Sequence, residues 1–117
     1  MILGIGVDMV KTEKIKHAIN RWGNDFIKRV FNEHELDNIP FGKIYYQRLA
    51  ARFAAKEAVI KAISKAYPLS LRDITILNRN NGAPYCNVKN KSNLNIFISL
   101  THIEDYAVAC AVAEETA

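Results

Sequence analysis

A small set of residues in this chain could together bind a metal ion and phosphate. The acids are Asp8, which follows two closely spaced glycines, and Glu57, which lies among alanines in mid-chain. Arg52, Lys61 and His102 are the accompanying bases. Carboxylates without a cluster of histidines or cysteines suit a hard cation such as Mg²⁺, which completes its ligand shell with water and phosphate oxygens. The residue types suggest metal-assisted chemistry on a phosphate ligand, but spacing alone does not show that the two acids meet.

The stretch around Glu57 predicts one long helix, from about Ile44 to Ala66. No glycine or proline interrupts it, whereas Pro40-Phe41-Gly42 breaks the chain before it and Pro68 bars its continuation. Lys61 follows Glu57 by one helical turn, so the residues alone also allow a buried Glu57–Lys61 ion pair in place of a metal site. Cations at every fourth residue predict a basic stripe on another side of this helix: Arg48, Arg52 and Lys56.

The first segment, Ile2 to Val7, predicts a buried strand. One face carries Gly4 and Gly6 and then Asp8, and positions without side chains leave space for another backbone or a ligand. The simpler interpretation is that the glycines only allow close packing of a helix on the sheet and that Asp8 ends the strand. The opposite face is expected to be apolar and buried: Leu3, Ile5 and Val7.

Basic residues gather on the next predicted element, a helix that starts at Thr12 and ends at Gly23. A basic helix face is usually only solvated surface, but this one supplies much of the net charge and could dock an acidic protein. A shorter helix is predicted at Asp25–Phe31, and Asn32 with Glu35 predicts a capping box that opens a further turn. The apolar stripe of the first helix is Ile15, Ala18, Ile19 and Trp22, and its basic side is Lys14, His17 and Arg21.

The second half of the chain predicts strands. The expected elements are Ile74–Leu77, a hairpin turn at Asn80–Gly82, the return strand Tyr85–Val88, a strand through Ile96, Ile98 and Leu100 that delivers Thr101-His102 at its end, and Tyr106–Ala113.

Length and composition set the outer bounds. The 117 residues are expected to form a single domain, 1–117, with a net charge of +4 that favours an acidic or phosphate-bearing partner. No apolar run reaches transmembrane length and no leader is visible, so we expect a cytoplasmic protein with no membrane partner. Cys86 and Cys110 lack metal-type or redox-type spacing and are expected to be reduced, packed thiols.

Several blocks of the sequence resemble the holo-[acyl-carrier-protein] synthases, the small bacterial class of 4′-phosphopantetheinyl transferases. The signature blocks are Gly4–Asp8, Arg52–Ala62 and Ser99–His102, and they fall in the family's order and spacing. Phe26–Asp37 and Asn81–Tyr85 also resemble family sequence. The central block is specific, and the resemblance extends over essentially the whole chain.

The resemblance implies an α+β fold, with an antiparallel sheet packed on one long helix beside shorter N-terminal helices. It also implies a Mg²⁺-dependent enzyme that transfers the 4′-phosphopantetheine arm of coenzyme A to a serine of apo acyl carrier protein, leaving adenosine 3′,5′-bisphosphate. Asp8 and Glu57 would hold the metal, and Lys61 would add positive charge at the leaving phosphate. Either Glu57 or a metal-bound water would accept the serine proton.

Two further groups of residues take roles from the resemblance. Contacts to coenzyme A would come from Lys43, Arg52, Lys61, Thr101 and His102, with Thr101 and His102 in the same pocket. The carrier protein would dock on the first two helices, through Lys14, Arg21, Phe26 and Lys28. From the residues alone, His102 could instead be a structural residue that ends a strand and bonds backbone.

The resemblance finally implies a homotrimer with active sites between subunits. The strand Tyr106–Ala113 has no polar alternate position, so both of its faces need apolar cover. One long helix covers one face and leaves the other for neighbouring subunits, unless the strand is an internal one in a monomer. We expect small residues to let the sheets of neighbouring subunits approach, and arginine at Ala109 or Ala111 to yield inactive monomers.

A competing interpretation is a non-enzymatic basic module that binds nucleic acid or an acidic protein through Lys11–Arg29. Glu57 would then have a purely structural role. Trp22 and Phe26 are expected to face the core, which leaves no stacking platform for bases, so no nucleic-acid partner is predicted.

Overall fold

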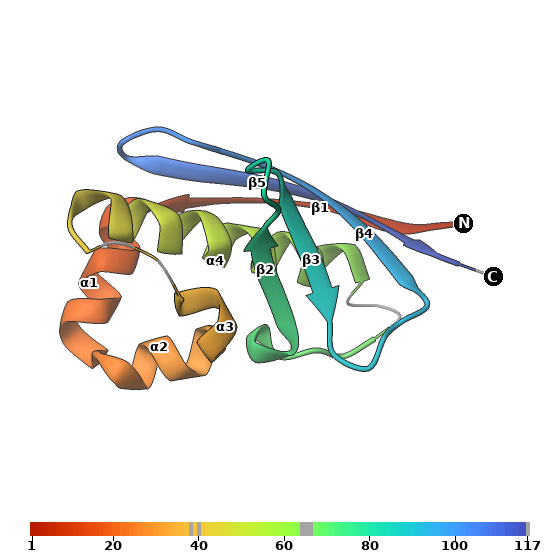
Figure 1. Ribbon diagram of the computed structural model, residues 1–117, viewed down its shortest axis with the longest axis horizontal. Helices are drawn as coiled ribbons and strands as arrows, with labels where there is room; N and C mark the ends of the chain where they lie inside the picture. The colour runs from red at the N-terminus through yellow and green to blue at the C-terminus, as the bar shows by residue number, and fades with distance from the viewer. Residues whose placement is uncertain (38, 40, 64–66, 117) are drawn as a thin grey trace.

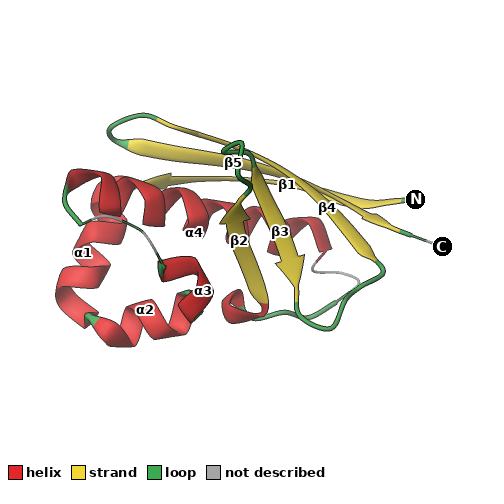
Figure 2. Ribbon diagram, viewed as in Figure 1, coloured by secondary structure: helices red, strands yellow, loops and turns green. Residues whose placement is uncertain are grey.

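The long helix and the antiparallel sheet that it covers form the centre of the fold (Figure 1). The structure is a computed structural model that describes residues 1–37, 39, 41–63 and 67–116, except for the side chain of Lys43. Figure 2 shows the short N-terminal helices curled below one end of the long helix and a β-hairpin lying in front of it. In chain order the elements are β1 (Ile2–Lys11), α1 (Thr12–Trp22), α2 (Asn24–Val30), α3 (Glu33–Leu36), α4 (Lys43–Ile63), the short 3₁₀ helix η1 (Leu71–Asp73), β2 (Ile74–Asn78), β3 (Pro84–Val88), β4 (Leu94–His102) and β5 (Tyr106–Glu115).

These elements confirm the predicted α+β fold. Gly23 separates α1 from α2 with a φ of 55°, a conformation that glycine adopts without steric cost. The predicted capping box opens α3, where the Glu35 carboxylate accepts the backbone N–H of Asn32 at 3.1 Å. The predicted long helix is confirmed as α4 up to Ile63, and its expected end at residues 64–66 lies outside the described residues.

The larger sheet has the strand order β1-β5-β4, all antiparallel, and β2 pairs with β3 in a separate hairpin. One row across the larger sheet joins Asp8, Ala109 and Leu100. Because side chains alternate between faces along a strand, His102 lies on the same face as Leu100. Asp8 and His102 therefore share the face that α4 covers, but they lie at opposite edges of the sheet.

Close approach between α4 and β1 depends on the glycines of β1. A Cβ at Gly4 or Gly6 would collide with backbone carbonyl oxygens of α4, those of Ala62 and Ala58. The prediction that the glycines allow close helix–sheet packing is confirmed. The expectation that Asp8 ends the strand is wrong, because β1 continues to Lys11 and Asp8 lies within it, beside the helix.

The outer face of the sheet differs from the prediction. The alanines of β5 are buried and pack towards α4, so their small size lets the chain's own helix approach and not a neighbouring subunit. The expectation that arginine at Ala109 or Ala111 would only separate subunits is therefore wrong, since it would disrupt the core. Side chains predicted to be buried on β1 lie on the opposite face, where Ile5 is 65% exposed. Large exposed side chains on that face are Ile5, Val7, Met9 and Phe97.

The N-terminal helices pack on α4 through part of their predicted stripe. Ile15 is buried, and Phe26 is half-buried with its ring centroid 6.4 Å from that of Phe53. Trp22, however, is 56% exposed at the end of α1, so the prediction that it faces the core is wrong. Among the described residues, every helix is too short or too polar to cross a membrane.

Lys56 also departs from its predicted place. Its side chain is fully buried in an ion pair with Glu35, and it does not extend the basic stripe of Arg48 and Arg52 to the surface. Burial lowers the pKa of the Lys56 ammonium, and the hydrogen bond and charge of Glu35 oppose this shift. A lysine inside a core needs such a partner, because an unpaired buried charge is costly.

Candidate functional site

A cluster of charged side chains forms where β1 passes α4. The Lys61 ammonium lies 3.0 Å from Asp8 Oδ1 and donates a second hydrogen bond to the Val7 carbonyl oxygen at 3.0 Å. Within the described residues Lys61 thus pairs with Asp8 and not with Glu57, so the Glu57–Lys61 pair considered from sequence is not formed. Lys61 is about half exposed, which leaves the cluster open to a ligand.

Glu57 faces this cluster from the same helix as Lys61. Burial raises the pKa of the Glu57 carboxyl, the negative charge of Asp8 raises it further, and Lys61 opposes both effects. Lys61 bonds Asp8 and lies one helical turn from Glu57 on α4, so the two carboxylates, 49 positions apart in the sequence, lie on the same side of that helix. An acid that is partly buried beside a second acid is stabilised in its charged form by an additional cation.

These residues fit a magnesium ion. No third aspartate, glutamate, histidine or cysteine joins Asp8 and Glu57 in the part of the chain that the structure describes. Zinc-type sites use several nitrogen or sulfur ligands, whereas Mg²⁺ is commonly held by one or two carboxylates and takes its other oxygens from water and phosphate. The pair of acids and the nearby ammonium therefore suit a metal bound together with a phosphate ligand.

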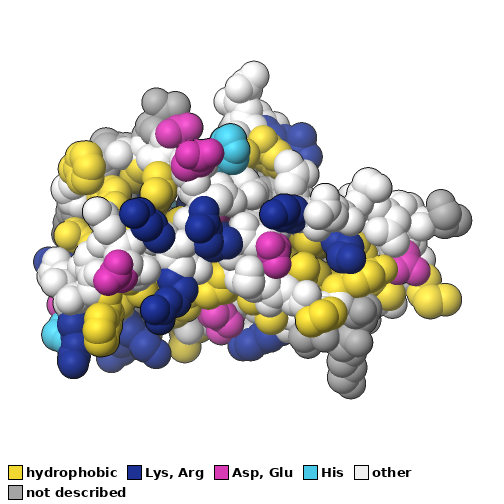
Figure 3. Space-filling model, turned by 90° about the horizontal axis from the view of Figure 1, so that it is seen from below, with side chains coloured by type: hydrophobic (Ala, Val, Ile, Leu, Met, Phe, Trp, Pro, Cys, Tyr) yellow, Lys and Arg dark blue, Asp and Glu magenta, His cyan; other side chains and the backbone are white. Residues whose placement is uncertain are grey.

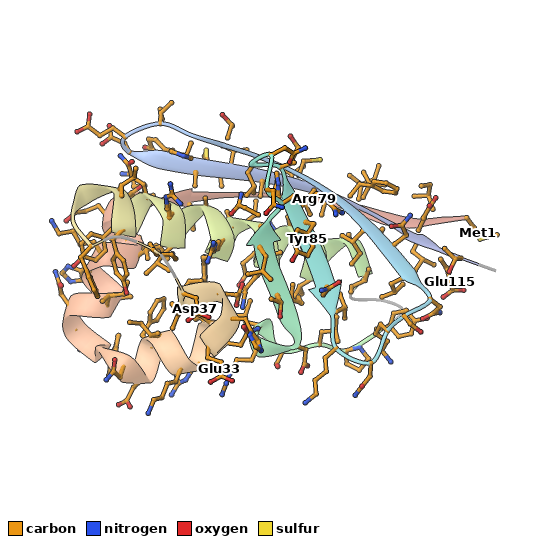
Figure 4. All side chains as sticks on the ribbon, in the orientation of Figure 1. Met1, Glu33, Asp37, Arg79, Tyr85 and Glu115 are labelled. Atoms are coloured by element: carbon orange, nitrogen blue, oxygen red, sulfur yellow. The ribbon has the colours of Figure 1, made fainter. Side chains whose placement is uncertain are left out.

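A second candidate region lies on the other side of α4. It is a cavity of about 650 Å³ between α3, α4, the β2–β3 hairpin and the end of β4. Figure 4 shows two of its residues from distant parts of the chain, Asp37 after α3 and Tyr85 on β3. The Arg79 guanidinium lies 4.8 Å from the Tyr85 ring centroid. We call this cavity the anion pocket. Its side chains that can bond a ligand include His34, Arg48, Arg52, Asn78, Tyr85 and His102.

Arg52 is the buried cation of the anion pocket. The residue is only 9% exposed, Nη2 donates to Asn78 Oδ1 over 3.5 Å, and Nη1 has no hydrogen-bond partner among the described residues. Burial lowers the pKa of the guanidinium, Glu35 raises it, and Arg48 lowers it. A buried donor without a partner is costly, so this guanidinium is suited to receive an anionic oxygen.

The predicted ligands of coenzyme A do not all meet in one chain. Arg52 and Lys61 are nine residues apart, and at about 100° per residue they project from opposite sides of α4. Thr101 points to the outer face of the sheet while His102 points to the anion pocket, so within one chain the two do not share a pocket as predicted. The side chain of Lys43 lies outside the described residues.

The exposed face of α1 carries the predicted docking residues. Lys14, His17 and Arg21 line a shallow depression together with Trp22, and the Arg21 guanidinium lies 5.0 Å from the Trp22 ring centroid. Figure 3, which views the molecule from below, shows Lys and Arg side chains gathered around the helical part of the surface. Lys28 on α2 is exposed, whereas Phe26 is half-buried against α4.

Residues 4–111 match the family model of the 4′-phosphopantetheinyl transferase superfamily. The chain belongs to this superfamily. A holo-[acyl-carrier-protein] synthase of Thermodesulfovibrio yellowstonii is 42% identical over 96% of the chain and 98% of that protein. The crystal structure of such a synthase from Neisseria meningitidis has a TM-score of 0.85 and 30% identity, over 98% of this chain and all of that one. A synthase of Bacillus anthracis, solved in complex with CoA (3′,5′-ADP), has the same TM-score and 29% identity, over all of this chain and 99% of that one.

The superfamily assignment makes this chain a phosphopantetheinyl transferase and rules out the non-enzymatic module. Sequence reasoning had missed the exposure of Trp22 and the contributions of Asn78 and Tyr85 to the anion pocket. Glycine at position 82 and the turn around it predicted the hairpin, but no local signal showed that the hairpin lies against Arg52. The roles expected for individual site residues stay predictions.

Proposed function

We propose that this phosphopantetheinyl transferase moves the 4′-phosphopantetheine arm of coenzyme A to a serine of an apo acyl carrier protein. The serine oxygen forms a bond to the phosphorus that carries pantetheine. The bond from that phosphorus to the bridging oxygen breaks, and adenosine 3′,5′-bisphosphate leaves. The convergence of Asp8, Glu57 and Lys61 carries this proposal, because it offers a cation site and an ammonium for a diphosphate.

Asp8 and Glu57 would hold Mg²⁺ at this cluster. The ion, when bound, would supply positive charge next to the diphosphate oxygens, which favours departure of the nucleotide. Lys61 would contribute further positive charge from the ammonium that now bonds Asp8. Glu57, whose pKa is raised by burial, would accept the serine proton.

Coenzyme A would contact two copies of the chain. The cluster of Asp8, Glu57 and Lys61 and the anion pocket lie on opposite sides of α4. A ligand that reaches both therefore needs the cluster of one subunit and the pocket of another. Arg52 and His102 would hold phosphate oxygens there, with Lys43 and Thr101 as further candidates. The unpartnered Nη1 of Arg52 supports an anionic ligand in this place.

A homotrimer would bring these half-sites together. The apolar outer face of the sheet, with Met9 64% exposed, supports contact between subunits because a patch of this kind is unfavourable in water. We expect Met9→Arg to yield monomers by sedimentation velocity, with Tm little changed and transfer activity lost. Wild-type protein that sediments as a fully active monomer would contradict the trimer.

The acyl carrier protein would dock on the exposed face of α1. Lys14, Arg21 and Lys28 supply positive charge for an acidic partner, and Trp22 adds an apolar contact beside Arg21. Phe26 lies under this surface and would support its shape. The cytoplasmic location expected from the sequence is part of the same proposal, with no membrane or nucleic acid as partner.

One assay tests the reaction. The purified protein is incubated with coenzyme A, MgCl₂ and apo acyl carrier protein. We expect the intact mass of the carrier to rise by one phosphopantetheine group and adenosine 3′,5′-bisphosphate to appear in equal amount. A carrier with alanine in place of its serine, and a reaction with EDTA, are the controls. Unchanged carrier mass in the complete reaction would contradict the proposed function.

A further inference from the structure

Behind the anion pocket lies the buried ion pair of Glu35 and Lys56. Both side chains are fully buried. Glu35 accepts two backbone N–H groups in addition to the lysine, from Asn32 at 3.1 Å and from Ile76 at 3.0 Å. One carboxylate therefore bonds the start of α3, strand β2 and helix α4 to one another.

The ammonium of Lys56 is equally well satisfied. Besides Glu35 it bonds the carbonyl oxygens of Val30 at 2.6 Å and Leu71 at 3.0 Å, and it lies 5.2 Å from the ring centroid of Phe31. These contacts connect α4 to the end of α2 and to η1. The pair thus joins segments from across the chain through charge-assisted, directional bonds.

The segments joined by the pair are walls of the anion pocket. Glu35 belongs to α3, Lys56 is one turn from Arg52 on α4, and Ile76 precedes the hairpin residues of the pocket. Each wall therefore has an anchored residue close to its lining residues. The lining residues nearest to these anchors are His34 and Asp37 on the first wall, Arg52 on the second, and Leu77 and Asn78 on the third.

We propose that the Glu35–Lys56 pair is a positioning device for the anion pocket. It fixes the spacing of the three walls, and so holds the Arg52 guanidinium, whose Nη1 has no partner among the described residues, in the orientation that receives a phosphate of coenzyme A. This inference rests on the proposed function for the identity of that ligand. Both side chains are fully buried and bond neither Asp8 nor Glu57, so the pair acts through Arg52 and its neighbours.

Stability alone is a poor explanation for such a pair. Replacing both partners of a buried ion pair by neutral residues of similar size often leaves stability unchanged or higher. Directional bonds between charged groups contribute geometry that apolar packing does not specify. The positioning role is therefore separable from the structural one in a variant that removes both charges.

The test is the double variant Glu35→Gln/Lys56→Met, in which glutamine keeps an acceptor for a backbone N–H and methionine is an uncharged, unbranched side chain one atom shorter than lysine. We expect the KM for coenzyme A and the Kd of adenosine 3′,5′-bisphosphate to rise by at least about tenfold. At saturating coenzyme A we expect kcat and the KM for carrier protein to stay within about threefold of wild type.

Val59→Ala is the matched control for a loss of stability. Val59 is buried on the same helix and supplies none of the groups that bond to Glu35 or Lys56. We expect this variant to lower Tm while the KM for coenzyme A stays at its wild-type value. An equal rise in KM in Val59→Ala would overturn the positioning role, since any weakening of the core would then have the same effect.

A folded double variant with unchanged affinity for coenzyme A would also overturn the inference. Where the double variant does not fold, hydrogen exchange of the wild type decides. We expect adenosine 3′,5′-bisphosphate to slow exchange at the Asn32 and Ile76 amides at least about tenfold more than at amides of β1. Equal slowing contradicts the positioning role, whereas a wild type that does not bind the nucleotide contradicts the proposed function as well.

Discussion

The open cluster around Glu57 and the buried network around Lys56 are built from neighbouring residues on one helix, but they differ in burial and in charge balance. The buried network pairs opposite charges and fills its remaining bonds with backbone groups. In the open cluster, two carboxylates face one half-exposed ammonium. A fully bonded network stabilises one arrangement of the chain, whereas a cluster with excess negative charge is suited to take up a cation. This difference separates the residues that hold the site from those expected to react.

The largest effect is expected at the open cluster. Asp8→Asn or Glu57→Gln should lower kcat for transfer by about a thousandfold or more, because the loss of a metal ligand leaves charge on the diphosphate uncompensated. Tm should hardly change. Steady-state kinetics at saturating Mg²⁺ measure this, with Glu114→Gln as a carboxylate control remote from the cluster. Wild-type turnover in either variant would remove the distinction between the two networks.

The free energy of unfolding should depend strongly on the buried network and only weakly on the open cluster. Lys56→Met leaves the Glu35 carboxylate buried without its cation and should lower the free energy of unfolding by about 3–5 kcal/mol. Lys61→Met removes an ammonium on the same helix that is about half exposed, and it should cost less than about 1 kcal/mol. Urea denaturation compares the two variants. Similar losses from both would show that burial does not distinguish the networks.

The pH dependence of stability sharpens the comparison further through Cys86, which lies beside the buried network. Burial raises the pKa of this thiol from 9.0 to about 12; the charge of Glu35 raises it and that of Lys56 lowers it. Between these values the unfolded chain has released the thiol proton and the native protein has kept it, so ionisation favours unfolding as the pH rises. Below pH 9 the thiol is protonated in both the folded and the unfolded state, so it does not change the pH dependence of stability.

The measurement is urea denaturation of wild type and Cys86→Ala at pH 8 and at pH 10.5. Relative to the variant, the wild type should lose about 1–2 kcal/mol between these two pH values. A constant difference between the two proteins would mean that the thiol titrates normally and that water reaches the network.

The smallest effect is expected on the docking face, where charges are exposed. Arg21→Glu should raise the KM for carrier protein by roughly three- to tenfold and leave the KM for coenzyme A unchanged, since exposed charge pairs contribute little and are screened by salt. Lys89→Glu, on a distant turn, is the charge-matched control. If Arg21→Glu and added salt both leave the KM for carrier protein unchanged, the basic face only confers solubility.

Local signals in the sequence predicted most elements of the fold. Gly23 ends α1, the Asn32/Glu35 box opens α3, and Gly82 has a φ of 90° in the predicted hairpin turn. These signals act over a few residues, so they do not depend on what packs against the element. The family blocks likewise pointed to Asp8 and Glu57, and the fold brings these two acids together.

The orientation of each element was harder to predict. Both faces of β1 offered a reason to be buried, apolar side chains on one and glycines on the other. Trp22 fitted the apolar stripe of α1, but it is more than half exposed in the fold. In each case burial depends on the shape and position of a distant partner, which a periodic pattern does not contain.

The sequence by itself determined which segments form helices and strands, which residue types could bind metal and phosphate, and the superfamily. Backbone preferences, caps and turns are local, and motif residues can be recognised one by one. The tertiary structure decided that Lys56 is buried with Glu35 while Glu57 faces Asp8, and that Arg52 and Lys61 lie on opposite sides of α4. Those outcomes depend on close approach: without side chains at Gly4 and Gly6, β1 lies near enough to α4 for Asp8 to reach Lys61.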